Sequence, residues 1–240
     1  MGIELTLPSG KKVEITPVDG KTERLIEDKK LLQSGAFIDK YLSSRIEAVD
    51  GDHSLTPQQK EKVVLDMLSG DRNYMLYKLR IESYGPEMIF NYECPSCKKT
   101  SGYKVDLNEM LEDGTVKVYP YRDEALRVEL PRSGGYALIE YMTGHDERRL
   151  AQLKSASFCD ATLIRIAELN GNPPTRKDLD DLIGKDLSAI RNGISEMANA
   201  GLVSTIELTC LDCGKDYTVG LASIMDFFAP WKTSTESVGP

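Results

Sequence analysis

The sequence is poor in the groups that most enzymes use for acid–base and nucleophilic chemistry. It has two histidines, His53 and His145, and neither belongs to an H-E-x-x-H metal motif or an evident Ser/His/Asp set. A G-x-x-x-x-G-K-[ST] phosphate loop and a G-x-S-x-G nucleophile elbow are also missing. Acidic runs such as Asp178–Asp181 are typical of solvated helix faces. We therefore expect a protein that is not an enzyme and has no catalytic residues.

Aromatic side chains and positive charge are scarce as well. Aromatic residues make up 7% of the chain, Trp231 is the single tryptophan, and the formal net charge is −8. Surfaces that bind nucleic acids need clustered Lys and Arg for the phosphates and aromatic rings for the bases. This composition disfavours nucleic acid as a partner and favours other proteins.

Signals for a membrane or for secretion are missing too. No apolar run approaches the length that spans a bilayer. The start, Met1–Leu5, lacks the basic residues that open a signal peptide. We expect no membrane contact and a reducing, intracellular or virion environment for the cysteines.

Cysteine is the residue type whose pattern is informative. Four of the five cysteines form two Cys-x-x-Cys pairs, Cys94-Pro-Ser-Cys97 and Cys210-Leu-Asp-Cys213. A two-residue spacer lets both sulfurs of one turn face the same point, so two pairs can surround Zn²⁺ tetrahedrally. We predict that Cys94, Cys97, Cys210 and Cys213 are metal ligands for one structural zinc per chain. Four thiolates leave no open position for a substrate, which argues against catalysis by the metal.

Each pair lies at the tip of a predicted β-hairpin. The alternating segments are 88–93 and 102–107 for the first pair, and 202–208 and 216–221 for the second. The segments Phe90–Lys98 and Ile206–Gly214 also align cysteine on cysteine, which indicates a weak repeat. In the second turn Gly214 can adopt the left-handed conformation, and Lys98 stands at the matching position of the first.

Other interpretations of the cysteines remain open. The pairs are separated by 112 residues, whereas zinc ribbons usually have fifteen to twenty, so a whole domain would have to lie between the knuckles. A disulfide framework would require an oxidising compartment, and a thioredoxin-like site usually places one pair at a helix N-terminus. Iron instead of zinc is a further option. Cys159, in an apolar stretch, is expected to be a buried small hydrophobic residue.

The pattern along the chain predicts an α+β fold with an N-terminal β-hairpin, helical layers and a split four-cysteine zinc ribbon formed by two distant hairpins around a mainly helical insertion. Helices are expected over Lys21–Gln33, from Phe37 to Ile46, and from Thr56, whose capping box includes Gln59. Asp71 is expected to cap the next helix. The expected regions are an N-terminal hairpin (1–18), a helical region (19–85), the split zinc ribbon (86–107 and 202–221), the insertion (108–201), and a C-terminal apolar turn and tail (222–240).

Within the insertion, the strands Val116–Tyr119 and Leu126–Leu130 are expected to precede several helices. Two of these helices are placed at Tyr136–Met142 and Cys159–Leu169. After the second knuckle, Phe227 and Phe228 are expected to be core residues.

The order of these elements resembles the base-plate hub and hub-assembly proteins of contractile-tailed phages (myoviruses). The features that carry the resemblance are Leu7-Pro-Ser-Gly-Lys11, Val13–Val18, the Cys94–Cys97 knuckle, the helices of 178–201 and Phe227-Phe228-Ala-Pro230. It covers nearly the whole chain.

The resemblance implies a late, non-enzymatic viral protein that helps to build the tail base-plate or forms part of it. Its partners would be other base-plate or hub proteins, with homo-oligomers as a further option. It would act in the host cytoplasm during assembly and in the virion tail if it is retained. The competing class is a nucleic-acid-binding zinc-ribbon regulator, with Lys98, Lys99 and Lys104 as contacts. A third class, a zinc or thiol enzyme, would require an open metal or a free thiolate.

Overall fold

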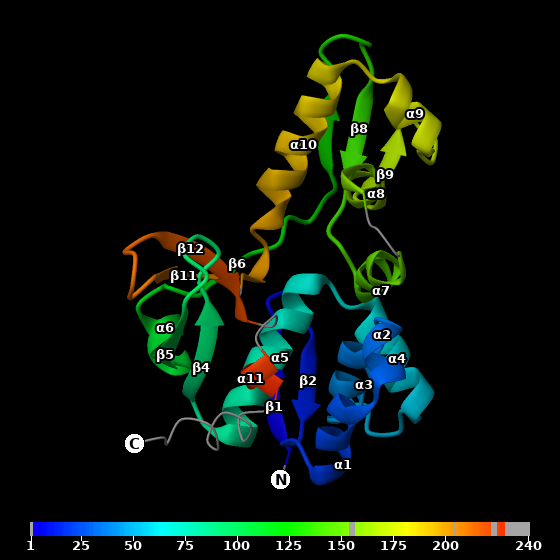
Figure 1. Ribbon diagram of the computed structural model, residues 1–240. Coiled ribbons are helices and arrows are strands. Elements are labelled where there is room, and N and C mark those ends of the chain that lie inside the picture. Colours follow the sequence, from blue (N-terminus) through cyan, green and yellow to red (C-terminus); the bar gives the residue numbers. More distant parts are fainter. Residues whose placement is uncertain (1, 154–156, 204, 222–224, 229–240) are drawn as a thin grey trace.

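Two similar α/β units and two cysteine hairpins make up most of the chain (Figure 1). The computed structural model describes residues 2–153, 157–203, 205–221 and 225–228. The mixed α and β composition and the N-terminal hairpin followed by helices confirm those parts of the expected fold. The expected tail after Trp231 lies outside the described residues. Within the described part of the chain, every helix is too short or too polar to span a bilayer.

The first unit, residues 3–84, contains an antiparallel sheet in the order β1-β2-β3. Alternation of buried and exposed residues places one face of this sheet on the helices. Its elements are β1 (Ile3–Thr6), β2 (Lys12–Ile15), α1 (Gly20–Glu23), the 3₁₀ helix η1 (Arg24–Glu27), α2 (Lys29–Gln33), α3 (Phe37–Ser43), β3 (Ile46–Val49), α4 (Pro57–Asp66) and α5 (Ser69–Tyr84).

The second unit, residues 126–198, contains an antiparallel sheet in the order β7-β8-β9. In Figure 1 it stands above the first unit, with the long helix α10 leading down to the cysteine hairpins. Its elements are β7 (Leu126–Glu129), β8 (Tyr136–Ile139), α7 (Gly144–Gln152), α8 (Phe158–Ile164), β9 (Ile166–Leu169), α9 (Arg176–Asp181) and α10 (Gly184–Ala198).

Each unit is followed by a two-stranded cysteine hairpin. Other short elements connect these parts: α6 (Leu107–Glu112), β6 (Lys117–Tyr119), β10 (Gly201–Val203) and α11 (Met225–Phe228). The hairpins are β4 (Glu87–Glu93) with β5 (Thr100–Asp106), and β11 (Thr205–Thr209) with β12 (Asp216–Gly220). β6 pairs with β10, so the segment after the first hairpin is tied to the segment before the second.

Burial divides the molecule into two hydrophobic cores. One joins the first unit to both cysteine hairpins and to α11, and includes Tyr77, Phe90, Ile206 and Phe227. The other lies inside the second unit around Ile139 and Ile190. Phe227 and Phe228 are buried, as expected. The first unit and the hairpins therefore share one core, and the second unit has a core of its own.

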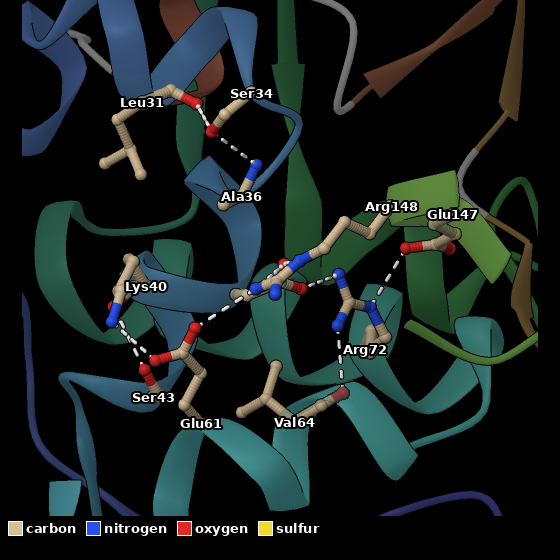
Figure 2. Close-up of polar contacts among 11 residues, drawn as sticks. Leu31, Ser34, Ala36, Lys40, Ser43, Glu61, Val64, Arg72, Glu147 and Arg148 are labelled. Atoms are coloured by element: carbon tan, nitrogen blue, oxygen red, sulfur yellow. Dashed lines mark hydrogen bonds and ion pairs between the residues drawn. The ribbon is translucent and has the colours of Figure 1, made fainter. Parts of the chain in front are cut away.

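A buried cluster of ion pairs connects α7 of the second unit to the first unit (Figure 2). Asp39 of α3 is fully buried, and its carboxylate lies 2.7 Å from the guanidinium of Arg72 and 2.7 Å from that of Arg148. Arg148 also reaches Glu61 at 3.1 Å, and Arg72 reaches Glu147 at 2.9 Å. Opposite charges taken out of water need such mutual contacts, so the cluster specifies how α7 docks.

The backbone before α7 completes this junction. Ser69 N donates to Met142 O at 2.8 Å, and Gly144 N donates to Met67 O at 3.1 Å. A Cβ on Gly144 would lie 2.2 Å from Nη1 of Arg72, so only glycine fits there without displacing the guanidinium.

Three of the expected helices of the N-terminal region were wrong in their limits. The helix expected over Lys21–Gln33 is divided into α1, η1 and α2, because the Asp28 side chain caps α2 by accepting from Lys30 N and Leu31 N. The helix expected to reach Ile46 ends at Ser43, and Ile46 starts β3.

Asp71 is not the cap of α5, which starts at Ser69. Its carboxylate accepts from Ser9 N in the β1–β2 turn instead. The capping box of Thr56 and Gln59 is confirmed.

Two of the helices expected in the second unit were also wrong. Tyr136–Ile139 forms strand β8, with Ala137 and Ile139 buried and alternate residues less so. The stretch Cys159–Leu169 is α8 followed by strand β9. Both are short apolar runs, for which helical and strand spacing look alike in the sequence.

Candidate metal centre

The two cysteine turns have the same backbone design. In the first, Cys94 N donates to Lys99 O and Lys98 N donates to Cys94 O, each at 2.9 Å. In the second, Cys210 N donates to Lys215 O and Gly214 N to Cys210 O, each also at 2.9 Å.

Both turns contain a left-handed residue, which was expected at Gly214 alone. Gly214 has φ +68° and Lys98 has φ +63°. This conformation reverses the chain after the second cysteine of each pair, so that both sulfurs of the pair point to the same side.

The hairpins bring all four predicted ligands together. The sulfurs of Cys94, Cys97, Cys210 and Cys213 all lie within 4.8 Å of one another. The shortest separations cross between the hairpins, 3.8 Å from Cys94 to Cys213 and 3.7 Å from Cys97 to Cys210. Within the described residues, this is the one group of three or more Cys, His, Asp or Glu side chains placed to share a metal ion.

These separations match a metal site and not disulfides. All five cysteines are free thiols. A disulfide joins its sulfurs at about 2.05 Å. A tetrahedron with Zn–S distances of about 2.3 Å has sulfur–sulfur edges of about 3.8 Å. The donor set is therefore suited to one tetrahedral ion.

The four cysteines differ in how deeply they are buried. Cys94 and Cys210, the first cysteine of each pair, are 1% and 2% exposed, whereas Cys97 is half-buried and Cys213 is exposed. Backbone N–H groups of Cys213 and Asp212 hold the pKa of the Cys210 thiol at about 6. At Cys97 the Lys99 N–H lowers the pKa, but desolvation and the neighbouring thiols outweigh it and raise the pKa to about 11.

Tyrosines and one ion pair join the two hairpins around the sulfurs. The hydroxyls of Tyr103 and Tyr217 lie 2.7 Å apart, and the rings of Tyr92 and Tyr217 stack at 5.6 Å. Lys99 Nζ of the first turn lies 2.8 Å from the Asp212 carboxylate of the second. Of these residues, sequence reasoning gave a role only to Lys99, as a contact of the competing nucleic-acid-binding class. The sequence did contain a feature that could have identified them, because each lies within eight residues of a cysteine on a predicted hairpin.

The other residues singled out in the sequence lie outside this cluster. Cys159 is partly exposed on α8, so the expectation that it is buried was wrong. His53 contacts Glu14 at 3.7 Å, and His145 contacts Asp66 at 3.0 Å, both at the surface. Lys104 pairs with Glu87 at 3.0 Å.

Comparison with known proteins assigns the chain to a family. No curated protein and no solved structure gives a significant match. The family model described as T4 bacteriophage base plate protein matches residues 1–229 of the 240. The chain therefore belongs to the T4 bacteriophage base plate protein family, which confirms the resemblance to phage base-plate proteins.

Proposed function

We propose that this base-plate protein is a structural or assembly component of the hub of a phage tail, in which one structural zinc ion joins the two cysteine hairpins. The observation that supports the tail assignment is the family match over residues 1–229. As a member of a base-plate family, the protein is a structural protein of the tail that associates with other tail proteins. The hub position, the assembly role and the zinc ion are the parts that we propose.

The argument for zinc is the closed set of four sulfurs. Cys94, Cys97, Cys210 and Cys213 supply a complete tetrahedral shell, which is typical of structural zinc. Zinc binding contributes about 10–16 kcal/mol in small zinc peptides, and a whole domain is usually stable by about 5–15 kcal/mol. An ion held by both hairpins would therefore decide whether they stay together.

Nearby lysines suit the charge of such a site. Four thiolates and one Zn²⁺ carry a net charge of about −2. Lys99 Nζ is held at the junction by Asp212, and Lys98 and Lys215 stand in the two turns. The bound ion would supply rigidity, since the shell has no position for water or substrate.

The function is tested in a host strain that produces the corresponding tails. Deletion of the gene should stop base-plate assembly, with tail intermediates that lack the hub in electron micrographs. Complementation with the wild-type gene should restore complete base-plates. Normal base-plates in the deletion strain would overturn the proposed function.

Quantitative mass spectrometry of purified particles distinguishes the two forms of the proposal. Peptides at a fixed ratio to known base-plate proteins indicate a structural subunit. Their presence in hub intermediates and absence from finished particles indicates an assembly factor. Absence from both would contradict the hub assignment.

A further inference from the structure

The second unit repeats the first in the order of its elements. Each has two antiparallel strands, helices, a third strand paired with the second, and two further helices (Figure 1). Each has a register shift between its second and third strands, at Glu14–Ile15 and at Leu138–Ile139. A cysteine hairpin follows each unit. The region between the two cysteine pairs thus contains a second copy of the N-terminal architecture.

Buried aspartates support this equivalence. Asp71, in the first turn of α5, accepts from Ser9 N in the turn between β1 and β2. Asp186, in the first turn of α10, accepts from Arg132 N and Ser133 N in the turn between β7 and β8. In each unit, an aspartate in the first turn of the last helix therefore connects that helix to the first hairpin.

The turn after the third strand is repeated as well. Asp50 and Gly51 have φ +49° and +84°, and Asn170 and Gly171 have φ +54° and +81°. In both units a capping box then starts the next helix, at Thr56 and at Thr175.

One arginine in each unit shows how the two units align residue by residue. Arg45 O accepts from Thr16 N, and Arg165 O accepts from Glu140 N. The Arg45 guanidinium also donates to Pro17 O, and the Arg165 guanidinium donates to Glu140 O. Both carbonyls lie just after the second strand of their unit.

The two copies differ in what covers the helix before this arginine. In the first unit α11 packs on α3. The ring of Phe228 contacts Phe37 and Tyr41 edge to face, with ring centres 5.3 and 5.5 Å apart. Phe227 and Phe228 are both buried there. An aromatic helical turn thus covers α3.

In the second unit the corresponding surface is an open apolar groove of about 280 Å³ between α8 and α10. With Arg45 matched to Arg165, Ala161 takes the place of Tyr41. The groove is lined by Phe158, Ala161, Thr162, Arg191, Ile194, Ser195 and Ala198. Phe158 lines this groove and is 63% exposed, so the groove and its rim form one exposed apolar surface.

The helix after the second strand is also placed differently in the two units. In the first unit the segment after β2 folds back over α3, where Thr22 Oγ1 lies 3.1 Å from Ser44 Oγ. The equivalent helix α7 instead docks on the first unit through Arg148 and Asp39.

Charge indicates what would fill the groove. The Arg191 guanidinium lies 4.4 Å from the centre of the Phe158 ring at the rim. In the part of the chain that the structure describes, Arg191 makes no ion pair. An occupant with a carboxylate beside aromatic side chains would therefore match both the apolar floor and the positive rim.

We propose that the α8–α10 groove is a docking site for a short helical segment of another tail protein that presents adjacent aromatic residues and an acidic residue. The occupied counterpart in this chain has that composition, Met225-Asp-Phe-Phe228. The interaction is independent of the cysteine cluster, so it goes beyond the proposed zinc function.

The test is a titration of the full-length, metal-loaded protein with a fluorescent peptide that copies residues 221–230. We expect saturable binding with one peptide per chain. A peptide with serine in place of both phenylalanines should not bind, and one with lysine in place of its aspartate should bind at least about tenfold more weakly.

Variants locate the binding. Ala161→Tyr places in the groove the side chain that Tyr41 has in the first unit, and should abolish binding. Arg191→Glu should weaken it at least about tenfold. Ile183→Asp changes an exposed apolar residue that does not line the groove, and should leave binding unchanged.

No saturable binding by the wild-type protein would overturn the proposal. So would binding that Ala161→Tyr and Arg191→Glu leave unchanged, since the peptide would then occupy another surface. Circular dichroism and the metal content of each variant confirm that the fold and the cysteine cluster are intact. The metal content also separates failure of this proposal from failure of the zinc proposal.

Discussion

At the scale of single residues, the buried carboxylate of Asp39 is the most consequential group outside the cysteine cluster. It is fully buried and forms ion pairs with two arginines, one of which, Arg72, is itself 3% exposed. Removal of one member of a buried ion pair leaves an uncompensated charge in a dry environment. This makes Asp39 more important to stability than its place on a short helix suggests.

Asp39→Ala is therefore expected to lower the free energy of unfolding by about 3–5 kcal/mol. Lys12→Ala is the matched control, because it removes an exposed pair with Glu4 and should cost less than about 1 kcal/mol. Denaturant titration of both variants gives the comparison. Equal effects would contradict the role assigned to Asp39.

The two left-handed turn positions allow a reciprocal test. Gly214→Ala introduces a side chain into open space at φ +68°, so only backbone strain changes, and stability should fall by about 1–2 kcal/mol. Lys98→Gly removes the equivalent strain at φ +63° and should not destabilise the protein. Thermal unfolding measures both. A loss of stability in Lys98→Gly as large as that in Gly214→Ala would contradict the shared turn geometry.

Residue-level prediction from sequence succeeded where the signal is local. The capping box of Thr56 with Gln59 and the turn at Gly214 each depend on a few consecutive residues. Asp39 could not be identified, because an acidic residue on an amphipathic helix looks the same whether solvent or two distant arginines face it. Arg72 and Arg148 lie 33 and 109 positions away in the chain.

At the scale of elements, the docking of α7 on the first unit depends on ionised carboxylates. Hydrogen bonds from Lys40 and Arg148 lower the pKa of Glu61 from its ordinary 4.5, against the effect of desolvation. A carboxylate whose pKa is lower in the folded state stabilises that state above its ordinary pKa. This stabilisation is lost as the pH falls through the lower, folded value.

We therefore expect the docking of α7 to weaken as the pH falls below about 4.5. Hydrogen exchange of the α7 amides between pH 6 and pH 3 measures this. Glu61→Gln should reduce the pH dependence, and the difference between variant and wild type cancels the effect of thiol protonation at the cysteines. Identical pH profiles would refute the contribution of Glu61.

Element types were predicted well where length, capping or clear alternation around a turn decided them. α4 and α10 carry long amphipathic patterns and are helices, as expected. β8 and β9 are four-residue apolar strands whose neighbours in the sheet are needed to distinguish them from helical turns. The pairing of β8 with both β7 and β9 is a tertiary interaction that no local pattern encodes.

At the scale of the whole molecule, the structure changes the view of the long region between the cysteine pairs. The sequence indicated a mainly helical insertion, but this region holds a complete three-stranded sheet and repeats the first unit. Besides the aligned cysteine turns, the sequence shows the repeat only in short pieces, such as Arg45–Asp52 and Arg165–Asn172. Elsewhere equivalent places differ, since Tyr41 and Arg72 have Ala161 and Leu187 there. The cysteine cluster thus joins one hairpin from each half of the chain.

The most direct test of this account is native mass spectrometry of the purified wild-type, Cys97→Ser and Cys210→Ser proteins, with the metal identified by elemental analysis. Because the hairpins share one site, we expect one zinc ion per wild-type chain and loss of that ion in either variant, although the serines lie in different hairpins. Cys159→Ser, outside the cluster, should retain the zinc. A wild-type chain without zinc, or a full zinc complement in Cys97→Ser or Cys210→Ser, would contradict a single zinc ion shared by the two hairpins.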